Sequence, residues 1–181
     1  GTGATLRLLK DENFGDRLGL DINPIAIKLC EERGLGQVKI GSITDIPLPS
    51  NFFDIIFATD VLEHESEDAS AIIELVRVLK PGGIMFLTVP AISSLWSAHD
   101  DAVGHKRRYR RLPFVRQLEQ HGLVVSRSFH INYLLFLPIF LTRQLFRVFR
   151  LSIRNENRVN TPMMNSILKA IFIADVTTAP I

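Results

Sequence analysis

The sequence predicts an α/β fold with a doubly wound, mostly parallel sheet. Up to residue 129, apolar runs of strand length alternate with amphipathic segments of helix length. Glycine and proline mark the boundaries between these segments. With 181 residues and 46% hydrophobic content, the chain can bury a core sufficient for one ordinary domain. We therefore expect one globular unit.

The predicted elements follow one another in a regular order. Strands are expected near 17–20, 37–40, 53–58, 84–89 and 123–129, and helices near 3–11, 24–33, 66–79 and 112–121. The helix over 24–33 begins at Asn23-Pro24, because Asn can cap a helix and Pro suits its first turn, and it stops before Gly34. The apolar stripe of the helix over 66–79 consists of Ile72, Ile73, Val76 and Leu79. The segment "KPGG" at 80–83 should then end that helix and turn into the next strand.

From residue 130 onward the alternation fails. The apolar run there ends at Arg143, short of the roughly 18 to 20 residues that a spanning helix needs. The arginines that follow lie on one face if the segment is helical: Arg143, Arg147, Arg150 and Arg154. Such a helix suits either a membrane interface, with its cations near anionic headgroups, or a lid packed on the domain. We expect a domain over 1–129 and a helical extension over 130–181.

Charge and cysteine content indicate the compartment and the partners that the protein is expected to have. Acidic residues outnumber basic ones in residues 1–100, and the reverse holds in residues 101–160. The single cysteine, Cys30, excludes an internal disulfide framework and fits a reducing compartment. We expect a cytoplasmic protein, with membrane association as an alternative. No RNA-binding module is recognisable, so nucleic acid is not an expected partner. The sequence does not indicate an oligomeric state.

Nucleotide chemistry is indicated at the start of the chain. Gly1-Thr2-Gly3 forms a glycine-rich turn, and Asp21 follows Gly3 by 18 positions at the end of a predicted strand. In nucleotide-binding α/β folds such a turn approaches the ligand closely, and an acid about 20 residues later accepts hydrogen bonds from ribose hydroxyls. A nicotinamide-dependent oxidoreductase would use the same two features, so other segments must separate the classes.

Further acids follow later strands. Asp45 closes "GSITD", and Asp60 lies at the carboxyl end of the strand in "FFDIIFATDVLEH". With "LKPGG" at 79–83, these segments resemble the class I S-adenosylmethionine-dependent methyltransferases, specifically the group that includes the ubiquinone and menaquinone methyltransferases. The matching residues are Gly1-Thr2-Gly3, Asp21, Thr44-Asp45-Ile46-Pro47, Phe53-Asp54, Val61-Leu62-Glu63-His64 and Leu79-Lys80-Pro81-Gly82-Gly83. They cover about residues 1–125 in the order typical of the family.

The resemblance implies a Rossmann-like fold of the class I methyltransferase type and S-adenosyl-L-methionine as the cofactor. The implied cofactor-binding residues are Gly1, Thr2, Gly3, Asp21, Ile22, Asp45, Ile46 and Asp60. Among them, Asp21 would hold the ribose, Asp45 would meet the adenine amino group and Asp60 would lie beside the sulfonium. In the family an apolar strand precedes the glycine turn. The chain is therefore expected to begin inside this motif, to lack the first strand and the last, and to be inactive or unstable by itself.

The implied reaction is an in-line methyl transfer, which needs alignment rather than a covalent enzyme residue. A base helps where the acceptor must lose a proton, and the candidates are His64, His99, His105 and Tyr109, of which His64, His105 and Tyr109 are the predicted catalytic residues. The loop "SLWSAHDDAVGHKRRYRR" occupies the usual acceptor region of the family, so Lys106, Arg107 and Arg108 could hold an anionic or aromatic acceptor.

The expected acceptor is a small molecule, a lipid-linked compound or a glycan. "DVLEH" also resembles a divalent-cation motif through Asp60, Glu63 and His64, but we assign no metal ligand. An NAD(P)-dependent oxidoreductase and a non-catalytic module that docks on membranes or partners remain as alternatives.

Overall fold

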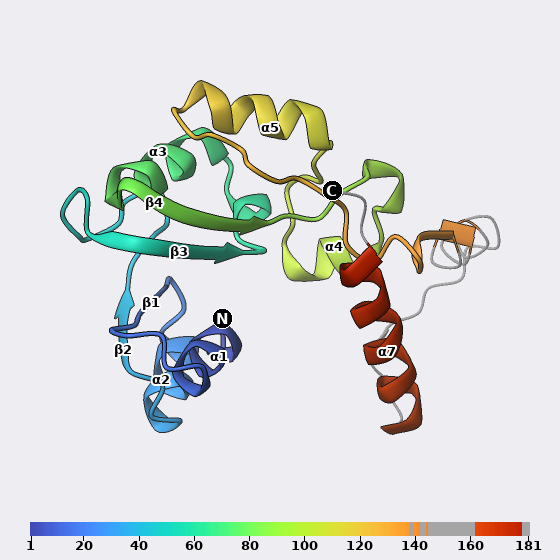
Figure 1. Ribbon diagram of the computed structural model, residues 1–181, viewed down its shortest axis with the longest axis horizontal. Coiled ribbons are helices and arrows are strands. Elements are labelled where there is room, and N and C mark those ends of the chain that lie inside the picture. The colour runs from blue at the N-terminus through green and yellow to red at the C-terminus, as the bar shows by residue number, and fades with distance from the viewer. Residues whose placement is uncertain (138–139, 142–143, 145–161, 179–181) are drawn as a thin grey trace. The chain divides into compact units, whose positions relative to one another are not determined.

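The computed structural model describes residues 1–137, 140–141, 144 and 162–178. The chain divides into two compact units, Gly1–Thr88 and Val89–Ile181, and each is described by itself (Figure 1). The arginine face that the sequence predicts at Arg143, Arg147, Arg150 and Arg154 lies outside the described residues. Among the described helices, none combines the length and the hydropathy needed to span a membrane.

The first unit alternates helices and parallel strands. In chain order its elements are α1 (Ala4–Asp11), β1 (Leu18–Asp21), α2 (Pro24–Glu32), β2 (Gln37–Ile40), β3 (Phe53–Thr59), η1 (Leu62–His64), α3 (Asp68–Val78) and β4 (Leu79–Thr88). Strand β1 pairs in parallel with β2, and β3 pairs in parallel with β4. The α/β class and the parallel pairing predicted from the sequence are confirmed.

The start and the end of helix α2 follow from residues next to them in the sequence. The Asn23 side chain accepts a hydrogen bond of 2.9 Å from the Ile25 amide, and Pro24 occupies the first turn. The helix ends at Glu32, before Gly34, which has a φ of +60°. Both predicted ends are correct to within a residue. The helix buries Ala26 and Cys30, so Cys30 is a core residue.

Strand β4 begins earlier than the sequence predicts. It starts at Leu79, directly after α3, and its pairing with β3 jumps from Phe53↔Leu79 to Ile55↔Ile84. The residues skipped in this irregularity are the predicted turn, and Gly82 there has a φ of +77°. Lys80 Nζ lies 2.8 Å from both carboxylate oxygens of Asp54. The hydrogen bond from Lys80 lowers the pKa of Asp54, which favours the ionised carboxylate in this ion pair.

The buried face of α3 differs from the predicted stripe. Ala71, Ile72, Leu75 and Val78 are buried, whereas Ile73 is 53% exposed. Leu79 is buried as the first residue of β4 rather than as part of the helix. The predicted and observed faces overlap at Ile72, but the helix is rotated so that Ala71 and Leu75 face the core in place of Ile73 and Val76. Five apolar residues in the stretch 71–76 allow several stripes, and only packing selects one.

The regular elements described in the second unit are helices. It contains η2 (Ser93–Leu95), α4 (Ala98–Val103), α5 (Arg111–Gln120) and α7 (Pro162–Thr178). The predicted strand over 123–129 is wrong, because this segment pairs with no strand in the part of the chain that the structure describes. Apolar residues at alternate positions do not make a strand unless a neighbour completes the hydrogen-bonded ladder.

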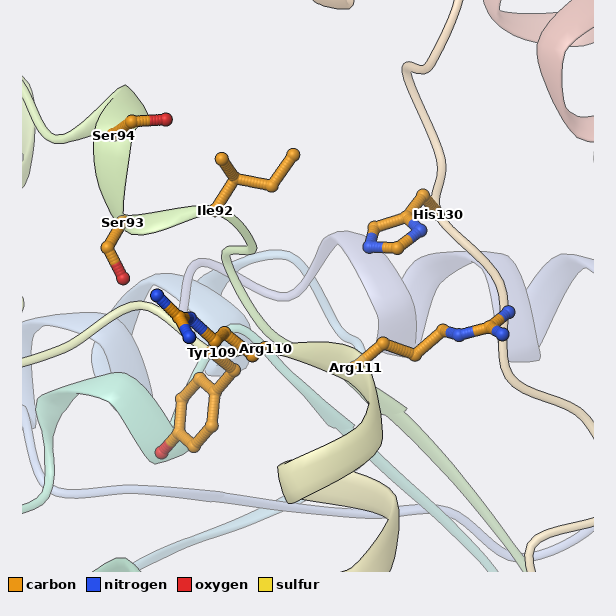
Figure 2. Close-up of a pocket in the computed structure, with 7 residues that line it drawn as sticks. All are labelled: Ile92, Ser93, Ser94, Tyr109, Arg110, Arg111 and His130. Atoms are coloured by element: carbon orange, nitrogen blue, oxygen red, sulfur yellow. The ribbon is translucent and has the colours of Figure 1, made fainter.

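Two sets of hydrogen bonds to the backbone stabilise the second unit. Tyr109 and Ala91 form a parallel bridge, in which the Tyr109 amide donates to Pro90 O at 2.8 Å. This bridge brings the residues that precede η2 beside the start of α5 (Figure 2). In α7, the fully buried Asp175 accepts hydrogen bonds from the amides of Asn132 and Leu134. Helix α7 is thereby fixed to the segment that follows residue 130.

Candidate functional site

The glycine turn and the first acid lie together in the first unit. Asp21 is the last residue of β1, and its carboxylate forms an ion pair with the amino group of Gly1. The other carboxylate oxygen accepts a hydrogen bond of 2.8 Å from the Asn23 amide. The Cys30 thiol approaches Gly1 O at 3.6 Å. The carboxyl end of β1 therefore places an acid beside a turn of backbone, as the sequence predicts.

Gly3 is the residue from which α1 starts. Its φ is +88°, a backbone conformation that glycine adopts without steric cost. A Cβ at this position would clash with Leu35 Cδ1 and would lie 2.9 Å from Cys30 Sγ. Both the backbone conformation and the packing of α2 and the following turn thus require glycine here. Thr2, between the two glycines, accepts a hydrogen bond of 2.6 Å from Arg33 at its carbonyl oxygen.

Replacing Gly3 by alanine is expected to lower the free energy of unfolding by about 2 kcal/mol, because the change combines left-handed strain with overpacking. Urea unfolding followed by circular dichroism measures the loss. Gly15→Ala is the matched control, since a Cβ at Gly15 meets nothing within 4 Å. Equal stability of the two variants would show that the Gly3 contacts relax at no cost.

Asp45 and Ile46 are held by α3. The Ile46 amide donates to Glu74 Oε2 at 2.9 Å, and Ile46 O accepts from Arg77 Nη2 at 2.9 Å. The hydrogen bond from Arg77 lowers the pKa of Glu74, so this anchor is ionic at neutral pH. Ile46 itself is 6% exposed and is mainly a core residue, whereas Ile22 is 71% exposed. The exposed Asp45 stands next to this anchored segment.

Asp60 occupies a strained position after β3. Its φ is +51°, which Asp tolerates better than most residues but which still costs free energy. The end of β4 holds it there: the Asp60 amide donates to Thr88 O at 3.0 Å, and Thr88 Oγ1 donates to the Asp60 carboxylate at 3.1 Å. Strained residues that neighbours hold in place are frequent at ligand sites. The carboxylate is exposed at the carboxyl edge of the β3–β4 pair.

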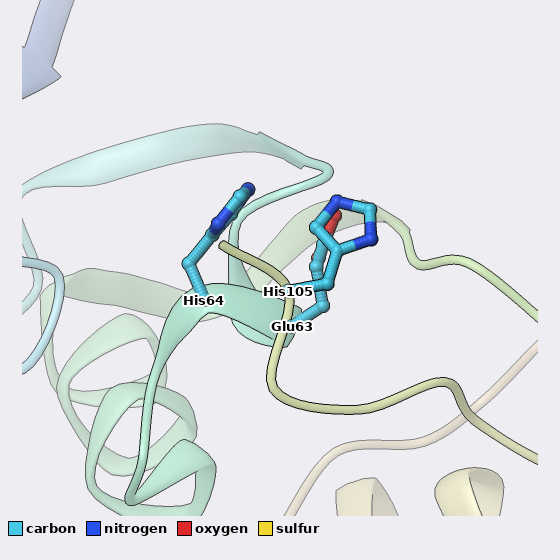
Figure 3. A group of neighbouring side chains, drawn as sticks. All are labelled: Glu63, His64 and His105. Atoms are coloured by element: carbon cyan, nitrogen blue, oxygen red, sulfur yellow. The ribbon is translucent and has the colours of Figure 1, made fainter. Parts of the chain in front are cut away.

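The three predicted catalytic residues fall in different units. His64 ends η1, where it follows the fully buried Glu63 and is itself half-buried (Figure 3). His105 and Tyr109 belong to the second unit. Tyr109 is 8% exposed, and its ring packs against Phe114 with centroids 4.7 Å apart.

A buried carboxylate organises the loop that contains His105. Asp100 is fully buried and accepts two hydrogen bonds from Arg108, Nε to Oδ1 at 2.8 Å and Nη2 to Oδ2 at 2.9 Å. His105 Nδ1 lies 2.8 Å from Asp100 Oδ1, and the Ser97 amide donates to Oδ2 at 2.8 Å. Burial alone would raise the pKa of Asp100. The hydrogen bonds from Arg108, His105 and Ser97 outweigh burial and hold this pKa well below its usual range.

This arrangement changes one expectation about the loop. The sequence predicts that Arg108 is available to an anionic acceptor. In the structure Asp100 already compensates the charge of Arg108, and a third hydrogen bond from Arg108 goes to Ala91 O at 3.0 Å. Two other arginines line a pocket at the start of α5, namely Arg110 and Arg111. Sequence reasoning missed them, together with His130. The available signal was an arginine pair at a helix start whose first turn contains no acid.

Comparisons with known proteins show what the first unit is similar to. Residues 1–87 match the family model described as a methyltransferase domain. The tRNA (carboxymethyluridine(34)-5-O)-methyltransferase of Arabidopsis thaliana is 34% identical over 87 residues, which are 46% of this chain and 20% of that protein. The malonyl-[acyl-carrier protein] O-methyltransferase of Serratia marcescens is 31% identical over 102 residues, which are 55% of this chain and 39% of that protein. The chain thus spans less than half of the length of these relatives.

Solved structures show the same fold. A putative sarcosine dimethylglycine methyltransferase from Galdieria sulphuraria aligns with a TM-score of 0.62 at 23% identity, over 98% of this chain and 69% of that one. A putative methyltransferase from Bacillus halodurans aligns with a TM-score of 0.60 at 18% identity, over 85% of this chain and 77% of that one. Residues 1–87, which contain the glycine turn, the acid after β1 and the parallel α/β pattern, are thus similar to a methyltransferase domain, and the fold is that of these solved structures.

Proposed function

We propose that the protein transfers a methyl group from S-adenosyl-L-methionine to a small-molecule, lipid-linked or glycan acceptor by in-line displacement. The observation that carries this proposal is the position of the Asp21 carboxylate at the carboxyl end of β1, within the stretch that matches the methyltransferase-domain model. A nicotinamide-dependent oxidoreductase would use a similar turn and acid, but the family match and the relatives favour methyl transfer.

The residues of the first unit fit the chemistry of this cofactor. The two carboxylate oxygens of Asp21 can accept both hydroxyls of a ribose. The exposed Asp60 carboxylate adds negative charge that favours a cationic sulfonium. When bound, the cofactor supplies a methyl group activated by its positive sulfur. The protein must then orient the acceptor and exclude water, and it needs no covalent residue.

A hydroxyl acceptor would also need a base, and His105 has the best-defined surroundings for that role. The Asp100 carboxylate accepts a hydrogen bond from His105 Nδ1–H, which selects the tautomer that carries an acceptor at Nε2. Asp100 is then a positioning residue. His64 and Tyr109 remain proposed alternatives as the base.

Isothermal titration calorimetry tests the proposed function directly. We expect the protein to bind S-adenosylhomocysteine, the demethylated product, and not NADH under the same conditions. Binding of NADH alone would establish the oxidoreductase alternative. Binding of neither would leave only a non-catalytic module and would overturn the proposal. A labelled-methyl transfer assay with cell extract then identifies the acceptor fraction.

A further inference from the structure

A pocket of about 310 Å³ lies in the second unit at the start of α5. Three separate stretches line it: Ile92, Ser93 and Ser94 before and within η2, Tyr109, Arg110 and Arg111 at the start of α5, and His130 (Figure 2). In Figure 2 the Arg110 side chain extends on the side of Ser93, and His130 and Arg111 lie on the opposite side of the pocket. We call it the Arg110–Arg111 pocket. Its size suits a small organic group.

A strained residue forms one wall of this pocket. Ile92 has a φ of +62°, an outlying conformation for a β-branched residue. Hydrogen bonds on both sides hold it: its amide donates to Tyr109 O at 3.1 Å, and its carbonyl oxygen accepts from the Leu95 amide at 3.0 Å. Such strain persists only where the surroundings enforce it, and it is concentrated at functional sites. The tight turn at Ile92 brings Ser93 and Ser94 into the lining of the same pocket as the arginines.

The charge of the pocket is positive and is not neutralised locally. Arg111 Nη1 donates to Ser128 O at 3.0 Å, which anchors the guanidinium on a neutral carbonyl group. In the stretches of the chain that the structure describes, no carboxylate forms an ion pair with Arg110 or Arg111. The first turn of α5 contains no acidic residue, so the positive end of the helix dipole adds to the arginine charges. This contrasts with Arg108, whose charge Asp100 compensates.

We infer that the Arg110–Arg111 pocket binds a small organic oxyanion, a carboxylate or a phosphate ester, whose apolar part contacts Ile92 and Tyr109. Guanidinium groups match the oxygens of both anions, serine hydroxyls donate further hydrogen bonds, and His130 can add a third donor. The inference goes beyond the proposed function, because it assigns an anion-binding pocket to the second unit alone. The binding of the anion does not depend on the proposed methyl transfer.

Calorimetric titration with hexyl phosphate and with hexanoate tests the inference. We expect saturable binding of at least one of them and no binding of hexanol. The double substitution Arg110→Gln/Arg111→Gln should weaken binding at least tenfold. Arg116→Gln is the matched control, because Arg116 is an exposed arginine on the same helix that does not line the pocket, and it should leave the affinity within about twofold. Circular dichroism checks that each variant is folded. If the double variant is not folded, the single substitution Arg110→Gln replaces it in the titration.

Several outcomes would overturn the inference. They are the absence of binding of both anions, equal binding of hexanol, or equal loss in the Arg116 variant, which would indicate nonspecific charge attraction.

Sedimentation with vesicles that contain anionic phospholipid distinguishes the source of the anion. Binding to vesicles that the double variant loses assigns a lipid phosphate, and binding of free hexyl phosphate without vesicle binding assigns a soluble anion. Titration with S-adenosylhomocysteine is independent of these measurements. Cofactor binding without anion binding would refute this inference alone, and anion binding without cofactor binding would refute the proposed function alone.

Discussion

Replacing Asp100 by alanine is expected to lower the free energy of unfolding of the second unit by about 3 to 5 kcal/mol, as is typical when one partner of a buried ion pair is removed. The substitution leaves the Arg108 guanidinium buried without its counter-charge and removes the acceptor for His105 and the Ser97 amide. Urea unfolding followed by the fluorescence of Trp96, the single tryptophan, reports on the same loop.

Asp101→Ala is the control for this prediction. Asp101 lies next to Asp100 on α4, but it is exposed and accepts a hydrogen bond of 3.0 Å from Trp96 Nε1. Its loss should cost no more than about 1 kcal/mol. A similar cost for both variants would mean that the buried cluster contributes no more than a surface contact.

The stability that Asp100 provides should also depend on pH. Its pKa in the folded protein lies well below the value of about 3.9 for an unfolded chain. The contribution is therefore complete above the unfolded pKa and is lost as the pH falls from about 4 toward the folded pKa. Between pH 5 and pH 2 the wild type should lose stability more steeply than Asp100→Asn, whose amide does not titrate. Parallel curves would refute the ionic role of Asp100.

Replacing Asp21 by alanine should weaken binding of S-adenosylhomocysteine about 10- to 100-fold, because hydrogen bonds to a charged acceptor contribute about 1.5 to 3 kcal/mol. Asp21 lies at the end of β1, where its partners are the Asn23 amide and the Gly1 amino group. The change removes no apolar packing, so the fold should remain. Calorimetry at one temperature and ionic strength measures the dissociation constant.

Asp16→Ala provides the comparison for this variant, since Asp16 is an exposed aspartate that precedes β1. Its affinity for S-adenosylhomocysteine should equal that of the wild type. Asp21→Asn should fall between the wild type and Asp21→Ala, because the amide retains one acceptor oxygen. An unchanged dissociation constant in Asp21→Ala would remove this residue from the cofactor site.

Local chemistry explains which elements of the first unit could be predicted. The Asn23-Pro24 start of α2 and the strand at 37–40 depend on neighbours in the chain, and the structure confirms both. The segment 123–129 and the buried face of α3 depend on partners elsewhere. A strand needs a neighbouring strand, and the stripe of a helix is selected by the surface against which it packs. The local sequence pattern indicates neither the strand that would pair with 123–129 nor the surface against which α3 packs.

The same distinction applies to the site. From the sequence alone follow the α/β class, the methyltransferase resemblance and the position of Asp21 at the end of a strand, because a parallel strand delivers its last residue to a known edge of the sheet. Only the tertiary structure decided which arginines are available. Lys106 to Arg111 read as one basic run, yet the buried Asp100 neutralises Arg108, and the turn at Ile92 makes Arg110 and Arg111 the walls of a pocket. Charge in a loop acquires its role from the groups that folding brings beside it, and those groups are not its neighbours in the sequence.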